Sequence, residues 1–187
     1  MILLIINDNF KKNYQAFNKT FSFTKANILG IIFAIPVLIL GPFIYGSVQK
    51  NISNSNIMIM GIGFVAGIFI HEFIHGFTWH LFCKEKWKSI KFGIDKKSFC
   101  PYTTCTEILS INSYRLGAVM PLIITGVLPY IIGILINNSN MVYIGTIMIA
   151  CAVGDLLILL TIVTEKSSSL CSDHPTSCGC VVYRKIN

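Results

Sequence analysis

The sequence predicts an all-α membrane protein with about four transmembrane helices and a small cytoplasmic region of loop and strand. Of its 187 residues, 53% are hydrophobic and only 12% are charged, whereas about a quarter of the residues in soluble domains are charged. The apolar residues gather into four stretches, each close to the roughly 20 residues that a membrane-spanning helix needs. The length is that of one domain, so we expect residues 1–187 to form a single membrane domain.

The four predicted spans cover residues 27–45, 57–82, 116–136 and 141–163. Prolines interrupt the first and the third span, and membrane helices tolerate such residues, usually with a kink. Four polar residues, Asn137 to Asn140, separate the last two spans, so these two should form a tight antiparallel hairpin. A tail follows at residues 164–187.

The segment 84–114, between the second and third spans, is too long for a simple turn. Its residues 87–94 alternate between polar and apolar side chains, a pattern typical of a short strand. We expect this strand to lie near the membrane surface.

The basic residues indicate how the chain is oriented. The five segments outside the spans carry four, one, seven, zero and three Lys or Arg residues in chain order. Fourteen of the fifteen therefore lie on one side, and the positive-inside rule places that side, with both termini, in the cytoplasm. The net charge of +7 does not indicate binding to nucleic acid, because the basic residues cluster in loops beside apolar runs, as in membrane proteins. We expect the lipid bilayer to be a partner and nucleic acid not to be one.

The candidate chemistry lies in the second span, where His71-Glu72-Phe73-Ile74-His75 forms an HExxH motif. Ionisable residues inside a bilayer are costly and usually functional. Residues i and i+4 share one helix face, so His71 and His75 can both bind one Zn²⁺ ion. Glu72 would then act as the general base on a water molecule. A catalytic zinc site needs a third protein ligand.

Asp155 is the expected third ligand because it matches the depth of His71. Both spans run from outside to inside, and each residue stands 14 positions after the first residue of its span, Ile57 or Met141. At 1.5 Å per residue, both lie about 21 Å from the outer end. A carboxylate at that depth needs a cationic partner such as a metal ion. His174 and Glu107 remain alternative third ligands.

Several stretches of the chain, between about residues 60 and 183, resemble a family of bacterial membrane proteins described as zincin peptidases. The matching residues are His71–Gly76, Ser89–Gly93, Pro101-Tyr102, Cys105–Glu107, Tyr114–Ala118, Pro121, Gly154-Asp155 and Asp173–Pro175. The resemblance implies a zinc peptidase of the bacterial cytoplasmic membrane. The layout is also similar to that of site-2 proteases, in which an Asp from a later span joins HExxH. In those enzymes Gly follows the Asp, whereas here Gly154 precedes it.

Other polar residues carry weaker signals. His80 is about 140° around the helix from His75 and cannot share its face. Glu107 is either an ordinary loop acid or the edge of a lid, and Arg115 either anchors the third span or orients Glu107 or a substrate carboxylate. His174 also fits a capping turn. A second zinc site would comprise His174, Cys171, Cys178 and Cys180, but this spacing matches no standard pattern.

The leading functional hypothesis is a membrane-embedded zinc metallopeptidase that hydrolyses peptide bonds of membrane or membrane-proximal substrates. The alternatives are a non-enzymatic metal-binding or transport protein and an inactive regulatory homologue. Glu72 discriminates between them, because metal transport needs ligands but no general base.

Overall fold

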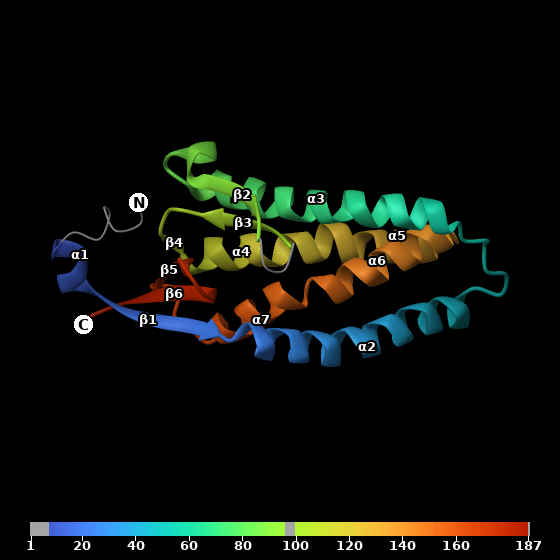
Figure 1. Ribbon diagram of the computed structural model, residues 1–187, viewed down its shortest axis with the longest axis horizontal. Coiled ribbons are helices and arrows are strands. Elements are labelled where there is room, and N and C mark those ends of the chain that lie inside the picture. Colours follow the sequence, from blue (N-terminus) through green and yellow to red (C-terminus); the bar gives the residue numbers. More distant parts are fainter. Residues whose placement is uncertain (1–7, 96–99, 187) are drawn as a thin grey trace.

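The computed structural model describes residues 8–95 and 100–186. Figure 1 shows an elongated bundle of helices, with the strands and both ends of the described chain gathered at one end. Most of the described chain is helical, and the strands form two small antiparallel sheets. The fold is therefore mostly helical, with more β-structure than the sequence predicted.

The first two long helices are α2 (Phe23–Val48) and α3 (Ile57–Phe82). Helix α2 continues through both of its prolines and extends beyond the predicted stretch 27–45 at each end. Helix α3 covers the predicted stretch 57–82, and Asn56 caps its N-terminus, because the Asn56 side chain accepts hydrogen bonds from the amides of Met58 and Ile59. Such a cap satisfies amide groups that have no partner inside the helix.

The third long helix begins at Ile111, five residues before the predicted start at residue 116. It comprises α4 (Ile111–Pro121), a π-helical segment η3 (Leu122–Val127) and α5 (Leu128–Leu135). The Ser110 side chain accepts a hydrogen bond from the amide of Ser113 and so caps the helix. The wide π turn precedes Pro129, which has no amide hydrogen for the carbonyl four residues earlier.

The fourth predicted span, 141–163, is not one straight helix. It consists of α6 (Ser139–Cys151) and α7 (Val153–Ile162), which are bent by 45° relative to each other. The backbone leaves helical geometry at Ala152, where ψ is 8°. Gly154, a poor helix former, follows two residues later. The bend gives α7 a direction and an N-terminus of its own.

The apolar surface of the bundle is extensive. Three helical stretches, Thr24–Val48, Ile57–Phe82 and Ile111–Leu135, are long and apolar enough to cross a membrane, and α6 with α7 makes a fourth if the bent pair is one span. Large apolar side chains on these helices are exposed: Ile57 is 82% exposed and Phe43 is 68% exposed. Apolar surfaces of this size mark contact with lipid or with other proteins.

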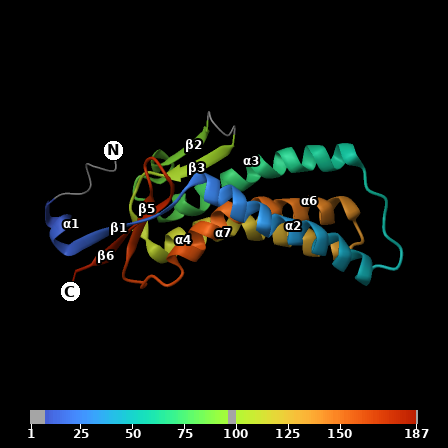
Figure 2. The same ribbon diagram turned by 60° about the horizontal axis from the view of Figure 1, so that its bottom comes forward.

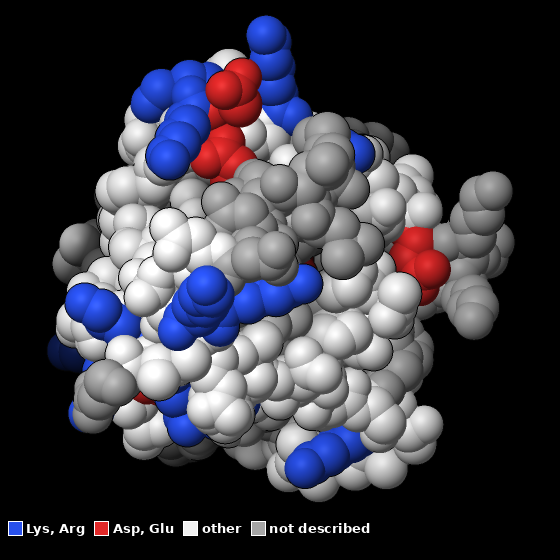
Figure 3. Space-filling model, turned by 90° about the vertical axis from the view of Figure 1, so that its left-hand side faces the viewer, with Lys and Arg blue, Asp and Glu red and all other residues white. Residues whose placement is uncertain are grey.

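A four-stranded antiparallel sheet closes one end of the bundle, as Figure 2 shows from a second direction. Its strand order is β1 (Tyr14–Phe21), β6 (Cys178–Lys185), β5 (Leu170–Asp173) and β4 (Leu109–Ser110). A short helix, α1 (Asp8–Asn13), precedes β1. This sheet joins the N-terminal arm to the residues that the sequence analysis treated as a tail. Figure 3 shows Lys and Arg side chains spread over this end.

A second sheet is the hairpin of β2 (Ile90–Ile94) and β3 (Pro101–Cys105), in which Phe92 pairs with Thr103. The predicted strand began at residue 87, but residues Lys86–Ser89 form a 3-10 helix, η2. The hairpin lies beside α3 (Figure 1).

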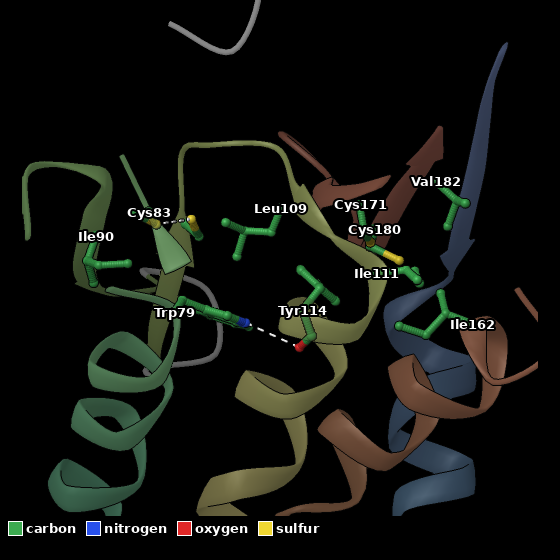
Figure 4. Packing of buried hydrophobic residues seen from close by; sticks show 11 residues of the cluster. Trp79, Cys83, Ile90, Leu109, Ile111, Tyr114, Ile162, Cys171, Cys180 and Val182 are labelled. Atoms are coloured by element: carbon green, nitrogen blue, oxygen red, sulfur yellow. Dashed lines mark hydrogen bonds between the residues drawn. The ribbon is translucent and has the colours of Figure 1, made fainter. Parts of the chain in front are cut away.

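The buried apolar core lies where the two sheets meet the helix ends (Figure 4). The cluster draws on α3, α4, α7 and the strands, and it consists of Trp79, Cys83, Ile90, Cys105, Leu109, Ile111, Tyr114, Ile162, Cys171, Cys180 and Val182. Because water is excluded there, the helix ends and the strands are held in fixed relative positions.

Candidate metal centre

Three ligand-bearing side chains converge between α3 and α7. The Nε2 atom of His71 lies 3.0 Å from Oδ2 of Asp155, and Nε2 of His75 lies 3.3 Å from Oδ1 of the same carboxylate. One potential ligand atom from each residue lies within 4.8 Å of the other two. In residues 8–95 and 100–186, no other group of three His, Cys, Asp or Glu residues meets this criterion.

The local geometry of each helix explains the convergence. His71 and His75 are one turn apart on α3, and their ring centroids are 4.9 Å apart. Asp155 stands in the first turn of α7, where the helix dipole favours a negative charge. Both histidines are buried, and Asp155 is partly buried.

Hydrogen bonds fix which histidine nitrogen is free. The Nδ1–H group of His75 donates to the Gly117 carbonyl at 2.9 Å, so Nε2 keeps its lone pair. The Thr125 hydroxyl donates to the Pro121 carbonyl, and its oxygen lies 3.5 Å from Nδ1 of His71. Such partners orient metal-binding histidines and set their tautomers. Both Nε2 atoms therefore face Asp155 as potential ligands.

The donor set fits zinc. Two ligand atoms bound at 2.0–2.2 Å to a tetrahedral ion lie about 3.4 Å apart. The distances of 3.0 and 3.3 Å from Asp155 to the two imidazoles are close to that value. Two neutral imidazoles and one carboxylate are also a ligand set of the catalytic type, in which a fourth position stays open.

Glu72 lies beside this cluster and lines a groove. The hydroxyl oxygen of Thr103, on β3, is 2.8 Å from both the carbonyl oxygen and Oε2 of Glu72. The groove has a volume of about 410 Å³. Its walls come from α3 and the hairpin: Phe69, Glu72, Phe73, Phe92, Gly93, Ile94, Pro101 and Tyr102.

Gly76, directly after the motif, allows the hairpin to approach α3. A Cβ atom at this position would lie 2.6 Å from the Phe92 ring and 2.8 Å from a methyl carbon of Ile90. Any larger residue would therefore require the side chains of Phe92 and Ile90 to shift.

Comparison with known families now identifies the chain. A family model described as "Putative zincin peptidase" matches residues 64–170, which is more than half of the sequence. The protein belongs to this zincin peptidase family. Comparisons with curated proteins and with solved structures found no match.

The family match covers all three potential ligands. It begins inside α3 before His71, and it ends at Leu170 after Asp155. The strands β1 and β6 lie outside it. The matched region therefore contains all of α7 and the part of α3 that carries both histidines.

The alternative third ligands lie outside the cluster. His174 Nδ1 accepts hydrogen bonds from the amides of Thr176 and Ser177, so this residue forms a capping turn. His80 stacks on Trp87, with ring centroids 4.4 Å apart. Among the described residues, no cysteine belongs to a group of three potential ligands, so the second zinc site does not form.

Glu107 and Arg115 form hydrogen bonds with the backbone just after α3 and at the end of α7, respectively. The Glu107 carboxylate accepts hydrogen bonds from the amides of Lys84 and Glu85 and from the Ser89 hydroxyl. Burial raises the pKa of Glu107, but these hydrogen bonds outweigh it and hold the pKa below its usual range. The Arg115 guanidinium donates to carbonyl groups at the C-terminal end of α7 and directly after it. Neither residue lies in the cluster as a ligand.

The residues that surround the two histidines and Glu72 were not predicted from the sequence. Thr125 and the Gly117 carbonyl form hydrogen bonds with His71 and His75, and Thr103 forms one with Glu72. Gly117 belongs to one of the stretches that carry the family resemblance, and this was the one sequence signal that pointed to it. The contact itself could not be predicted, because every residue has a backbone carbonyl.

Proposed function

We propose that this protein is a membrane-embedded zinc metallopeptidase. The observation that carries the proposal is the convergence of His71, His75 and Asp155 directly beside Glu72. The family match supports peptidase chemistry. The exposed apolar helices support placement in a membrane.

Zinc at this position would supply Lewis-acid polarisation of the substrate carbonyl and would acidify water. His71, His75 and Asp155 would hold the ion. Glu72 would accept the proton of the attacking water and pass it to the leaving amine. Thr103 would hold the Glu72 carboxylate in place, and the Gly117 carbonyl would keep Nε2 of His75 free.

The groove beside Glu72 is the proposed entry path for the peptide. Most of its lining is apolar or aromatic, with contributions from Phe69, Phe73, Phe92 and Tyr102. Such a surface favours apolar segments of a substrate. We therefore propose membrane proteins or membrane-proximal peptides as substrates.

The orientation follows from charge. We propose that both termini and the β-structured end lie in the cytoplasm of a bacterium, with the helices in the cytoplasmic membrane, because fourteen basic residues fall on that side. The catalytic site would then lie within the bilayer but nearer to its cytoplasmic face.

The deciding experiment compares Glu72→Gln with the wild type in detergent micelles. Glu72→Gln should retain zinc and lose hydrolysis of fluorescein-labelled casein, because glutamine cannot accept the proton. Glu85, just after the end of α3, is an exposed acid. Glu85→Gln is therefore the matched control and should cleave casein at the wild-type rate. Equal rates for wild type and Glu72→Gln would refute the proposal. A wild type that holds zinc without cleaving peptides would favour metal binding or transport.

A further inference from the structure

Asp173, the last residue of β5, links the terminal sheet to two elements that surround the metal centre. Its Oδ1 accepts a hydrogen bond from the Tyr114 hydroxyl at 2.6 Å. Its Oδ2 accepts one from the backbone amide of Cys105 at 2.8 Å. Tyr114 lies in the first turn of α4, and Cys105 ends β3. One carboxylate therefore joins three separate elements.

The contact with Cys105 leads to Glu72. Thr103 stands two residues earlier on the same strand, and its hydroxyl lies 2.8 Å from Oε2 of Glu72. Because residues two apart in a strand keep a fixed spacing and face, anchoring the amide of Cys105 also fixes the position of Thr103 along α3.

The contact with Tyr114 leads to His75. One turn further along α4, the Gly117 carbonyl accepts the hydrogen bond from Nδ1 of His75. The ring of Trp79 stacks on both Tyr114 and His75, with centroid distances of 5.4 and 5.2 Å. Its Nε1–H group donates to the Tyr114 carbonyl. Fixing Tyr114 therefore fixes the surroundings of His75.

We propose that Asp173 is a positioning residue, which holds β3 and α4 in the register that aligns Glu72 and His75. The inference rests on the proposed function for the roles of these two residues. Asp173 is not in the metal cluster, and it acts through Cys105 and Tyr114. The terminal sheet is thereby part of the support of the metal centre.

Two substitutions separate geometry from charge. Asp173→Ala removes both hydrogen bonds. Asp173→Asn can keep both, because its oxygen can accept from the Cys105 amide while its NH₂ group donates to the Tyr114 hydroxyl oxygen. If Asp173 is a positioning residue, the alanine variant should lose most of its peptidase activity and the asparagine variant should keep most of it.

The test measures the full chain in detergent micelles with zinc bound. In Asp173→Ala, hydrogen–deuterium exchange should accelerate in residues 101–105 and 111–118 and stay unchanged in α6. The kcat for fluorescein-labelled casein should fall by about 10- to 100-fold, as for other partners that orient metal ligands, with KM and zinc content unchanged. Asp173→Asn should restore kcat to within about threefold of wild type, because it keeps the orienting hydrogen bonds.

Glu165→Gln is the matched control, because it weakens the same sheet elsewhere. Glu165 bonds to Arg184 on β6 and to Lys19 on β1. This variant should lose thermal stability and keep the wild-type kcat. Unchanged exchange at 101–105 in Asp173→Ala would overturn the inference, as would a loss of kcat that follows a loss of zinc. If the zinc-loaded wild type cleaves neither casein nor an apolar membrane-spanning peptide, the proposed function is wrong, and the exchange data still decide whether Asp173 holds β3 and α4.

Discussion

His71 Nε2 lies 3.0 Å from Asp155 Oδ2, although 84 positions separate the two residues in the chain. The contact joins α3 to the first turn of α7, next to the bend at Ala152. The carboxylate lies against both imidazoles, so a single cation between them would neutralise it.

Removing either histidine should remove the metal. Purified wild-type protein should carry about one zinc ion per chain, because the cluster offers three ligand atoms. His71→Ala and His75→Ala should each lose it, measured by elemental analysis after dialysis. His80→Ala is the control, since this ring stacks on Trp87 outside the cluster. Full zinc content in both cluster variants would show that these histidines are not ligands.

Asp155→Asn should weaken zinc binding by more than about tenfold, because the substitution removes the negative charge from the cluster, and even outer partners of zinc ligands contribute 10- to 100-fold. Asp173→Asn should leave the affinity unchanged, since Asp173 contacts Tyr114 and Cys105 instead. Competition with a fluorescent chelator measures both constants. An unchanged zinc affinity in Asp155→Asn would show that Asp155 is not a zinc ligand.

Thr103→Val should lower kcat about tenfold, a loss typical of partners that orient a metal site, because the variant loses the hydroxyl that contacts Oε2 of Glu72. Zinc content should stay at the wild-type level. Thr104→Val is the control, since successive side chains of a strand point to opposite faces. Steady-state hydrolysis of labelled casein measures both variants. If they behave alike, the contact with Glu72 has no role in catalysis.

Fusions with topology reporters at Asn54 and Asn138 should both report the outer side of the membrane. The basis is the distribution of fourteen basic residues on one side and one on the other. Fusions after Ile186 should report the cytoplasm. An internal signal at Asn54 or Asn138 would contradict the proposed orientation.

Glu165 should make the terminal sheet sensitive to acid. Hydrogen bonds from Arg184, with a smaller contribution from Lys19, lower the pKa of this carboxyl to about 2. A depressed folded-state pKa stabilises the protein above the unfolded pKa, near 4.5, and this stabilisation is lost as pH falls toward 2. Thermal unfolding between pH 7 and pH 2.5 should therefore show a steeper loss for wild type than for Glu165→Gln. Parallel curves would exclude the effect.

The sequence by itself determined the helices and the shared helix face of His71 and His75. A long apolar stretch such as residues 57–82 is a local property, and helical geometry alone puts His71 and His75 on one face. Matching depths also predicted that Asp155 lies level with His71. That estimate treated residues 141–163 as a straight helix, and the two side chains meet even though the helix bends at Ala152.

The tertiary structure decided the rest. Strand β1 pairs with β6, which lies at the other end of the chain, and such pairing depends on where the helices bring the two segments. The surrounding hydrogen bonds likewise come from distant elements: the Gly117 carbonyl on α4 accepts from His75, and Thr103 on the hairpin contacts Glu72. Asp173, from the terminal sheet, contacts Cys105 and Tyr114. Helical periodicity fixes contacts within about one turn, whereas contacts between distant elements depend on packing that no local pattern encodes.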